Sequence, residues 1–531
     1  MKLTVNQVMQ KAINEQTEGN FEEAERLYQD ILKAEPKNPD ANHNLGALNV
    51  SLKKIDIGLS FLKTALDLDS SREQFWASYI AILIDSGHFE EAKKNLKKAK
   101  EKGFKSEKFT TLEAYAYFNL GNSLKGMGRL EEAEASYRQA IVLKSDYIEA
   151  HNNLGNTLKK IGKIEEALKS FRKAIAINPE FSEAHNNLGN SLQELGRLKE
   201  AEASYRQAIS LKPDYAEAHN NLGRSLKDMG RLDEAEASYR QAISIKPSYD
   251  EAISNLGILY HDCGQFKKAS EHLRLVDSCL GNIYLLKCLY MLDQESNFYS
   301  QLDHVMKQSE NNATIGSIIS SSNIRYGVGR HNPFCNEPLK YTLQTSLLEQ
   351  YDFKSIFVDG FSEILGDQEI QTRSQALLTK GTQTAGNIFT RNGPVTDAIQ
   401  SIIHLELEKY RVRFKDSDEG LITSWPTDYS IFGWLVSMKS GGELAPHMHE
   451  RGWISGSIYI NVPSKLNNDS GNLVLEASRI EDMIDGSDNK KSIDVVTGNL
   501  CLFPSSLHHY TIPFESKEDR TVLAFDIVPN S

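Results

Sequence analysis

Cysteine is scarce in this chain, with five cysteines among 531 residues. They are Cys263, Cys279, Cys288, Cys335 and Cys501. No two of them are spaced as in a Cys-x-x-Cys pair, and an odd number cannot form a complete set of internal disulfides. This pattern argues against a disulfide-stapled secreted protein. We therefore expect reduced thiols and a cytoplasmic location.

Long apolar runs are missing as well. No stretch of about 18 apolar residues occurs, so no membrane-spanning helix is predicted. The first residues, MKLTVNQVMQKAINEQ, lack the apolar segment of a secretory signal, and we expect none here. The formal net charge of −12 disfavours general binding to the phosphates of nucleic acids. We expect neither a membrane nor a nucleic acid as a partner.

The first half of the chain is periodic. A segment of the form NLGNSLKGMGRLEEAEASYRQAI recurs almost unchanged. Its glycines fall 34 residues apart, at Gly121, Gly155, Gly189, Gly223 and Gly257. Twelve residues after each glycine comes a small residue, at Ala133, Ala167, Ala201, Ala235 and Ala269. Extended backwards, this pattern predicts about eight units of paired helices over residues 5–278.

These units resemble the tetratricopeptide repeat. The resemblance implies that the helix pairs stack into a superhelix with a concave groove, because one pair alone cannot bury its apolar face. It also implies that the asparagine just before each Leu-Gly faces the groove. These asparagines include Asn119, Asn153, Asn187, Asn221 and Asn255.

A ladder of amide side chains could bind a peptide in that groove. Amides donate to and accept from a peptide backbone, whatever the side chains of the peptide are. The arrangement resembles the asparagine ladder in the superhelix of O-linked N-acetylglucosamine transferase, which favours a protein or peptide partner. The alternative is that these asparagines are solvated residues copied by recent duplication of nearly identical units.

Beyond the repeats the pattern decays. Residues 279–345 begin with mixed apolar faces typical of two or three helices and continue into a stretch rich in Ser, Asn and Gly. Repeat arrays need a terminal element to cover their last apolar face. We therefore predict capping helices and a connector over residues 279–345.

The last part, residues 346–531, has a different pattern of apolar and polar residues. Ile399, Ile402, Ile403 and Leu407 are spaced as one face of a helix. From about residue 425, short alternating runs such as GWISGSIYINV and RTVLAFDIV are separated by turn signals. They predict a β-sandwich or barrel, for which a double-stranded β-helix, or jelly roll, is the natural candidate. The predicted fold class is an α+β multidomain chain, with an all-α tetratricopeptide superhelix followed by a jelly roll with flanking helices.

Three histidines and an arginine stand out in this β-rich part. His447 and His449 form a His-x-His pair at the start of a predicted strand, and His509 precedes a later one. Side chains at positions i and i+2 of a strand point to the same face, so the pair can address one metal. Two near ligands and a distant third fit a non-haem iron site. Arg520, eleven residues after His509, fits a pocket for a dicarboxylate.

The blocks that contain these residues resemble a known family. WLVSMKSGGELAPHMHERGWISGSIYINVP, GNLCLFPSSLHHYTIPF and EDRTVLAF resemble the 2-oxoglutarate/Fe(II)-dependent oxygenases that are often fused to tetratricopeptide repeats. The resemblance implies that His509, in the FPSxLxH pattern, is the third metal ligand. It also implies that Arg520 pairs with the far carboxylate of 2-oxoglutarate. The implied cofactors are Fe(II) and the cosubstrate 2-oxoglutarate.

The metal motif departs from the usual His-x-Asp or His-x-Glu of this class. Three neutral imidazoles leave the site more positive than a set with one carboxylate. Glu450 and Glu443 are alternative ligands at non-standard spacing, and His508 is the runner-up for the third position. The candidates for lining the cosubstrate and substrate pocket are Trp434, Ser455 and Tyr459.

We interpret the chain as a non-haem Fe(II)/2-oxoglutarate-dependent dioxygenase, expected to be a hydroxylase, whose repeats recruit a protein or peptide substrate. One alternative is a non-catalytic interaction scaffold with a metal-binding jelly roll. Another is an oxygenase that acts on a small molecule or glycan. A glycosyltransferase, which the repeats alone suggest, is disfavoured because the C-terminal part is too short for two nucleotide-sugar-binding domains and is rich in strands.

Overall fold

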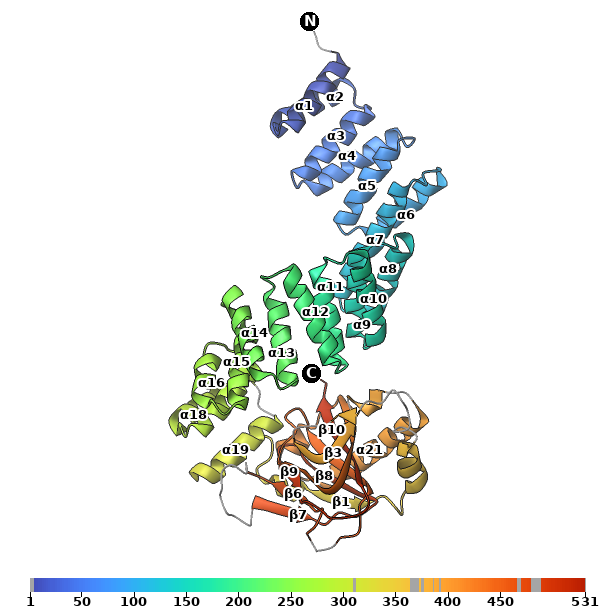
Figure 1. Ribbon diagram of the computed structural model, residues 1–531. Helices are drawn as coiled ribbons and strands as arrows, with labels where there is room; N and C mark the ends of the chain where they lie inside the picture. Colours follow the sequence, from blue (N-terminus) through green and yellow to red (C-terminus); the bar gives the residue numbers. More distant parts are fainter. Residues whose placement is uncertain are drawn as a thin grey trace. The chain divides into compact units, whose positions relative to one another are not determined.

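The computed structural model of the protein describes residues 4–308, 312–362, 372–373, 377–384, 386–390, 393–465, 469–478 and 489–530 (Figure 1). The chain divides into two compact units, residues 1–231 and residues 232–531. The domain limits expected from the sequence, at residues 278 and 345, fall inside the second unit and stay predictions.

The first unit consists of helix pairs joined by short turns. Its helices are α1 (Val5–Thr17), α2 (Phe21–Ala34), α3 (Pro39–Ser51), α4 (Ile55–Leu68), α5 (Glu73–Asp85), α6 (Phe89–Glu101), α7 (Glu107–Gly126), α8 (Leu130–Leu143), α9 (Ile148–Lys160), α10 (Ile164–Ile177), α11 (Ser182–Glu194), α12 (Leu198–Leu211) and α13 (Ala216–Asp228). Each helix packs against the next one along the chain. α7 has 20 residues where α9 has 13, and it begins directly after residues 102–106, which interrupt the 34-residue spacing of the earlier units.

The recurring glycines make room for aromatic side chains of the following helix. A Cβ atom at Gly155 would lie 2.6 Å from the ring of Phe171, and one at Gly189 would lie 2.6 Å from the ring of Tyr205. A Cβ atom does not come this close to a non-bonded carbon atom in a real structure, so a larger residue at either glycine would force the two helices apart. Both rings are fully buried. The predicted helix pairs are confirmed.

Helices continue into the second unit. They are α14 (Leu232–Ile245), α15 (Asp250–Asp262), α16 (Phe266–Leu273), α17 (Cys279–Met291), α18 (Glu295–Gln308) and α19 (Ala313–Tyr326). α14, α15 and α16 belong to the predicted repeats, whereas α17, α18 and α19 lie where capping helices are predicted. α19 ends before Gly327, whose φ of 67° is the left-handed conformation that glycine adopts most easily.

The rest of the second unit is built on antiparallel strands. They are β1 (Leu343–Ser346), β2 (Thr372–Arg373), β3 (Leu378–Thr384), β4 (Tyr429–Leu444), β5 (Ile454–Asn461), β6 (Leu473–Glu476), β7 (Lys490–Ile493), β8 (Asn499–Pro504), β9 (His508–Thr511) and β10 (Arg520–Pro529). Within the described residues, the larger sheet has the order β1-β8-β5-β10-β4-β3-β2 and the smaller one β7-β6-β9. Strands far apart in sequence are neighbours, as in a jelly roll. The predicted fold class is confirmed.

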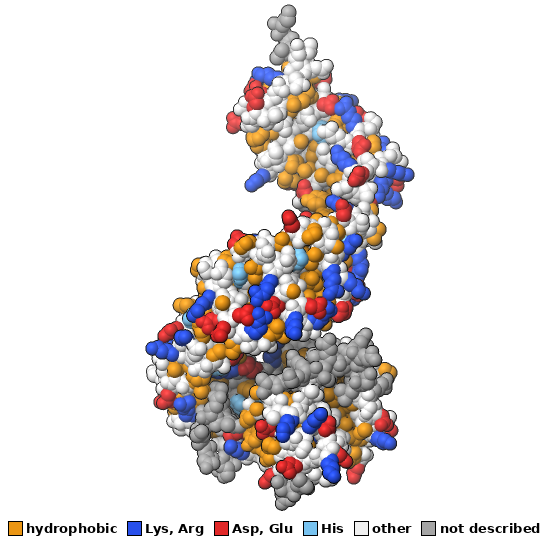
Figure 2. Space-filling model, in the orientation of Figure 1, with side chains coloured by type: hydrophobic (Ala, Val, Ile, Leu, Met, Phe, Trp, Pro, Cys, Tyr) orange, Lys and Arg blue, Asp and Glu red, His pale blue; other side chains and the backbone are white. Residues whose placement is uncertain are grey.

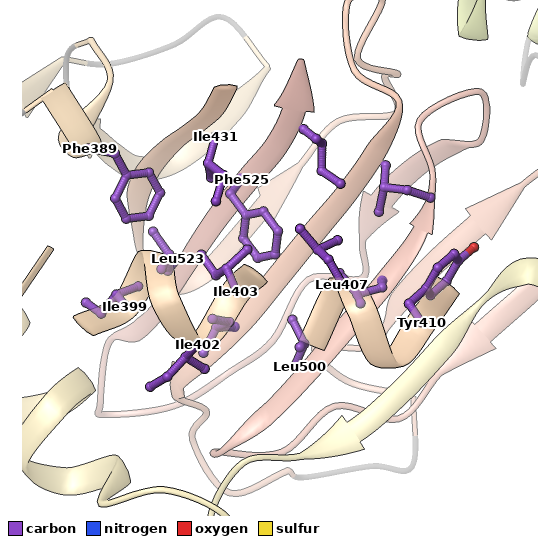
Figure 3. Packing of buried hydrophobic residues seen from close by; sticks show 14 of the residues in the cluster. Phe389, Ile399, Ile402, Ile403, Leu407, Tyr410, Ile431, Leu500, Leu523 and Phe525 are labelled. Atoms are coloured by element: carbon purple, nitrogen blue, oxygen red, sulfur yellow. The ribbon is translucent and has the colours of Figure 1, made fainter. Parts of the chain in front are cut away.

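Helix α21 (Pro394–Arg413) covers one face of the larger sheet (Figure 3). Its apolar face was predicted from the spacing of isoleucines, and Ile399 and Ile403 are at most 1% exposed. These side chains pack with Leu523 and Phe525 of β10. Since side chains alternate along a strand, the residues between them point to the opposite face of the sheet. Shorter elements complete this part: the helical turns Pro338–Tyr341, Lys354–Asp359 and Ile388–Thr390, and α22 (Gly420–Thr423).

Basic and acidic side chains alternate over the visible face of the helical array (Figure 2). Some form ion pairs between neighbouring repeats, such as Arg138 with Glu166 at 2.6 Å and Arg231 with Glu202 at 2.7 Å. That face therefore shows no broad patch of one sign. Among the described helices, none combines the length and the apolar character needed to cross a lipid bilayer.

The glycine–aromatic contacts predict the effect of one added methyl group. Gly155→Ala places a Cβ against Phe171 and should lower the free energy of unfolding by about 1–3 kcal/mol, because the helices must separate. Gly126→Ala is the control, since Gly126 also lies in a helix but has no neighbour within 4 Å. It should be neutral or stabilising. Chemical denaturation followed by circular dichroism measures both, and equal effects would contradict the packing explanation.

Candidate metal centre

The two sheets meet at the histidines singled out in the sequence. His447 lies three residues after β4 and His509 lies on β9. Their backbones form an antiparallel bridge, in which the His447 N–H donates to the His509 carbonyl at 3.1 Å and the His509 N–H donates to the His447 carbonyl at 2.8 Å. This bridge sets the third predicted ligand beside the His-x-His pair.

The three imidazole rings converge on one point. The ring centroids of His447, His449 and His509 are 4.3 to 5.1 Å apart, and one ligand atom of each lies within 4.8 Å of the others. The Nε2 atoms of His447 and His449 are 3.2 Å apart. Two nitrogens bound at right angles, each about 2.1 Å from a metal, would be about 3 Å apart. The spacing therefore suits adjacent ligands of one ion.

The second nitrogen of each ring is directed to an acceptor. His447 Nδ1 donates to the Ala445 carbonyl at 2.8 Å, and His509 Nδ1 lies 3.4 Å from the Leu507 carbonyl. A carbonyl can only accept, so each Nδ1 carries the proton and each Nε2 keeps its lone pair for a metal. Burial lowers the pKa of His447 to about 4 and that of His509 well below its usual value. Both rings are thus in the neutral form that binds metals.

A carboxylate that the sequence analysis did not single out orients the third ring. His449 Nδ1 donates to Asp526 Oδ1 at 2.7 Å, and the Ser455 hydroxyl donates to the same oxygen at 2.7 Å. A carboxylate behind a metal-binding histidine fixes the ring and makes it a stronger ligand. Asp526 is on the same face of β10 as Arg520. Because side chains two residues apart on a strand share a face, the even spacing between Arg520 and Asp526 could have predicted that both line one cavity.

Arg520 is buried at the other end of this face. Its side chain is 1% exposed, and its guanidinium lies over the ring of Tyr459, 5.2 Å from the centroid. Nη1 donates to the Gly471 carbonyl, whereas Nε has no hydrogen-bond partner among the residues that the structure describes. Burial lowers the pKa of Arg520 from its usual value. A buried cation with an unused N–H is costly, unless an anion binds there.

A single cavity joins the histidines to the arginine. Its volume is about 740 Å³. The three histidines, Arg520 and Asp526 line it, together with the predicted lining residues Trp434, Ser455 and Tyr459. Along the strand ladder Ser455 is opposite Asp526 and Tyr459 is opposite Val522. Ser455 therefore belongs to the His449 end of the cavity, and Tyr459 belongs to the Arg520 end.

The alternative ligands are not part of the histidine triad. His508 precedes His509 on β9 and its Nδ1 is 3.5 Å from the Ser317 hydroxyl of α19, outside the triad. The carboxylate of Glu450 forms an ion pair with Lys287. Glu443 lies in the ladder of β4, opposite Thr379 of β3. Among these candidates the structure brings together the three histidines first proposed.

The asparagines of the repeats bond to one another. Asn187 donates to Asn152 of the preceding repeat at 3.0 Å, and Asn221 donates to Asn186 at 3.1 Å. Asn153 likewise donates to Asn122 at 2.9 Å, Asn119 donates to the carbonyl of its own helix at Tyr115, and Asn255 is partly buried on α15. Each inter-repeat bond uses one N–H of an amide that also has a second N–H and a carbonyl. The ladder therefore links neighbouring repeats, and its peptide-binding role stays a prediction.

Known families match both parts of the chain. Residues 433–526 match the family described as "Putative 2OG-Fe(II) oxygenase". Tetratricopeptide-repeat families match residues 9–72, 121–162, 155–196, 180–248 and 226–279. No curated protein matches the chain.

Several solved structures are similar to the repeats. MamA is 24% identical over 34% of this chain and 94% of its own, with a TM-score of 0.29. PilF of Pseudomonas aeruginosa is 17% identical over 40% of this chain and 98% of its own, with a TM-score of 0.36. YrrB, described as a TPR protein with an unusual peptide-binding site, is 20% identical over 43% of this chain and 95% of its own, with a TM-score of 0.26.

The family matches cover the helix-pair part and the strand-rich part of the structure separately. The oxygenase match runs from β4 to β10 and includes the three histidines, Arg520 and Asp526. The repeat matches begin in α1 and reach the start of α17. The chain is a tetratricopeptide-repeat array fused to a domain of the 2OG-Fe(II) oxygenase family.

Proposed function

We propose that the protein is an Fe(II)- and 2-oxoglutarate-dependent hydroxylase that acts on a protein or peptide recruited by its repeats. One observation carries this proposal. A single cavity holds three imidazoles, each with a ring nitrogen within 4.8 Å of those of the other two, and a buried arginine with an unused N–H. The first group suits a metal ion, and the second suits the carboxylate of a cosubstrate.

His447, His449 and His509 would hold the metal. Three imidazole ligands on one side of an ion leave the other positions for cosubstrate and oxygen. The usual carboxylate ligand is replaced by a third imidazole, but Asp526 lies one hydrogen bond behind His449. Its negative charge offsets part of the positive charge of the ion without occupying a coordination position. The donor set therefore fits a divalent metal.

Arg520 would bind the far carboxylate of 2-oxoglutarate. A guanidinium presents parallel N–H groups to a carboxylate, and burial strengthens that ion pair. The ring of Tyr459 below the guanidinium holds it in position. When bound, iron and 2-oxoglutarate supply the oxidising power for hydroxylation, with O₂ consumed and succinate and CO₂ released.

The remaining side chains shape the space in front of the metal. Trp434 packs its edge against His449, with ring centroids 5.3 Å apart. Phe432 lies next to it along the same face of β4 and is 43% exposed. These rings would exclude bulk water from the histidines while leaving an apolar entrance. A substrate group that reaches the metal must pass them.

The size of the cavity favours a second candidate, an oxygenase of a small molecule or glycan. A volume of about 740 Å³ is within the range of small-molecule sites. We favour a protein or peptide because asparagine amides recur from repeat to repeat, as a peptide-binding ladder requires, and because tetratricopeptide arrays are interaction modules. The two candidates differ in whether the repeats are needed for substrate binding.

Cosubstrate binding tests the proposal first. Purified under anaerobic conditions with Fe(II), the wild-type protein should bind 2-oxoglutarate and, on exposure to O₂, release succinate slowly. Arg520→Met should keep metal binding but lose 2-oxoglutarate binding by about 100-fold or more, because a charged hydrogen-bonded pair is lost. His509→Ala should lose both.

The control for Arg520→Met is Arg330→Met, which removes an arginine paired with Asp303 outside the cavity. It should bind 2-oxoglutarate like the wild type. Metal binding without 2-oxoglutarate binding at millimolar concentration in the wild type would instead support the scaffold interpretation.

The role of Asp526 can be measured on the metal alone. Asp526→Asn keeps the shape of the side chain but removes the charge behind His449, and should weaken Fe(II) binding about 10- to 100-fold. Ser455→Ala leaves the Asp526–His449 bond in place and should have a smaller effect. Anaerobic titration measures both affinities. Equal losses in the two variants would show that the charge of Asp526 is not the important factor.

Groove recognition has a matched pair of variants. Asn187→Ala with Asn221→Ala removes the amides predicted to face the groove. Asn152→Ala with Asn186→Ala breaks the same inter-repeat bonds from the acceptor side but keeps those amides. Peptides selected from a displayed library with the wild-type chain should bind the first variant at least about 10-fold more weakly, since several backbone hydrogen bonds are lost. Equal losses in both variants would point to the shape of the array instead.

A further inference from the structure

The metal-ligand segment is held by helices that lie outside the jelly roll. Glu450, the residue after His449, forms an ion pair with Lys287 of α17. The carbonyl of Glu450 accepts a hydrogen bond from the Thr314 hydroxyl of α19 at 3.0 Å. The two contacts come from residues 163 and 136 positions earlier in the chain. Glu450, next to the candidate ligand His449, is thus bound by two helices that follow the repeats.

The backbone explains why this segment needs support. β4 ends at Leu444, and β5 begins only at Ile454. His447 is fixed between them by its bridge to His509. Beyond His449 the chain forms a turn, in which the Gly452 N–H donates to the His449 carbonyl at 3.2 Å. A turn has few backbone bonds to a sheet, so its side chains and their partners decide where it lies.

Lys287 differs from a surface lysine because its side chain is largely buried. Its side chain is 11% exposed, and its ammonium lies 4.5 Å from the centroid of the Tyr284 ring. A cation with so little contact with water depends on its carboxylate more than an exposed one does. Tyr284 in turn meets His261 of α15 edge to face, with ring centroids 5.0 Å apart. The contacts therefore run from a helix of the last repeat to the neighbour of His449.

The same contacts bear on the entrance of the cavity. Glu450 and Arg451 line it together with His449. α19 lies beside the smaller sheet (Figure 1), where Ser317 approaches His508 at 3.5 Å. The helices thus contact both segments that carry the histidines: α19 approaches His508 of β9, and α17 and α19 contact Glu450 in the turn after His449.

We propose that Lys287 and Thr314 are positioning residues of the metal centre. By holding Glu450, they keep His449 at the distance from His447 and His509 at which one ion can bind all three. This inference rests on the proposed function, since it concerns the same metal site. It makes the helices after the repeats a structural part of the centre.

Co(II) binding by the full-length chain tests this directly, by calorimetry and by the visible absorption of the bound ion. Lys287→Met and Thr314→Val should each weaken Co(II) binding about 3- to 10-fold and change the absorption bands, because His449 moves relative to the other ligands. Lys287→Arg and Thr314→Ser keep the cation and the hydroxyl. They should restore an affinity and a spectrum close to those of the wild type.

Lys409→Met is the matched control, because it removes a lysine paired with buried Glu406 on α21, away from the cavity. It should lower stability but leave Co(II) binding unchanged. Wild-type affinity and spectrum in both Lys287→Met and Thr314→Val would overturn the inference, and so would an equal weakening in Lys409→Met. A wild-type chain that binds no Co(II) would refute the proposed function itself, and this inference with it.

Discussion

The candidate site depends on the two backbone hydrogen bonds between His447 and His509. They join the end of β4 in the larger sheet to β9 in the smaller one. Because the bonds fix both backbones, the two rings can lie 4.3 Å apart although a long stretch of chain separates them. The third ring needs a different support, since His449 lies beyond the bridge. Asp526 and Ser455 provide that support from the neighbouring strands β10 and β5.

The alternation of side chains along β10 divides the domain into a core and a cavity. Leu523 and Phe525 face α21 and stabilise the fold (Figure 3). Arg520 and Asp526 face the opposite side, with Val522 and Ala524 between them. The two charges are therefore carried by one rigid strand, at the two ends of the cavity. That separation suits the proposed anionic cosubstrate at one end and the proposed metal at the other.

Patterns that are local in sequence could be read without a structure, and contacts that depend on register could not. The repeat was evident from its 34-residue period, and the His-x-His pair from its spacing. Asp526 was missed because its role follows from standing opposite Ser455 in the ladder. For the same reason Ser455, expected near the cosubstrate, lies beside His449. The bond between Lys287 and Glu450 left no local signal, since it joins parts of the chain 163 residues apart.

These long-range contacts connect the candidate metal centre to helices that precede the strands, α17 and α19. If the metal centre were independent of the helices that follow the repeats, those helices would need no contact with the residue beside His449. Instead α17 and α19 both reach Glu450, which also lines the cavity. A displacement of α17 would move a near-buried cation away from its carboxylate and would disturb the turn that holds His449. A displacement of these helices would therefore be transmitted to the candidate metal centre through the turn that follows His449.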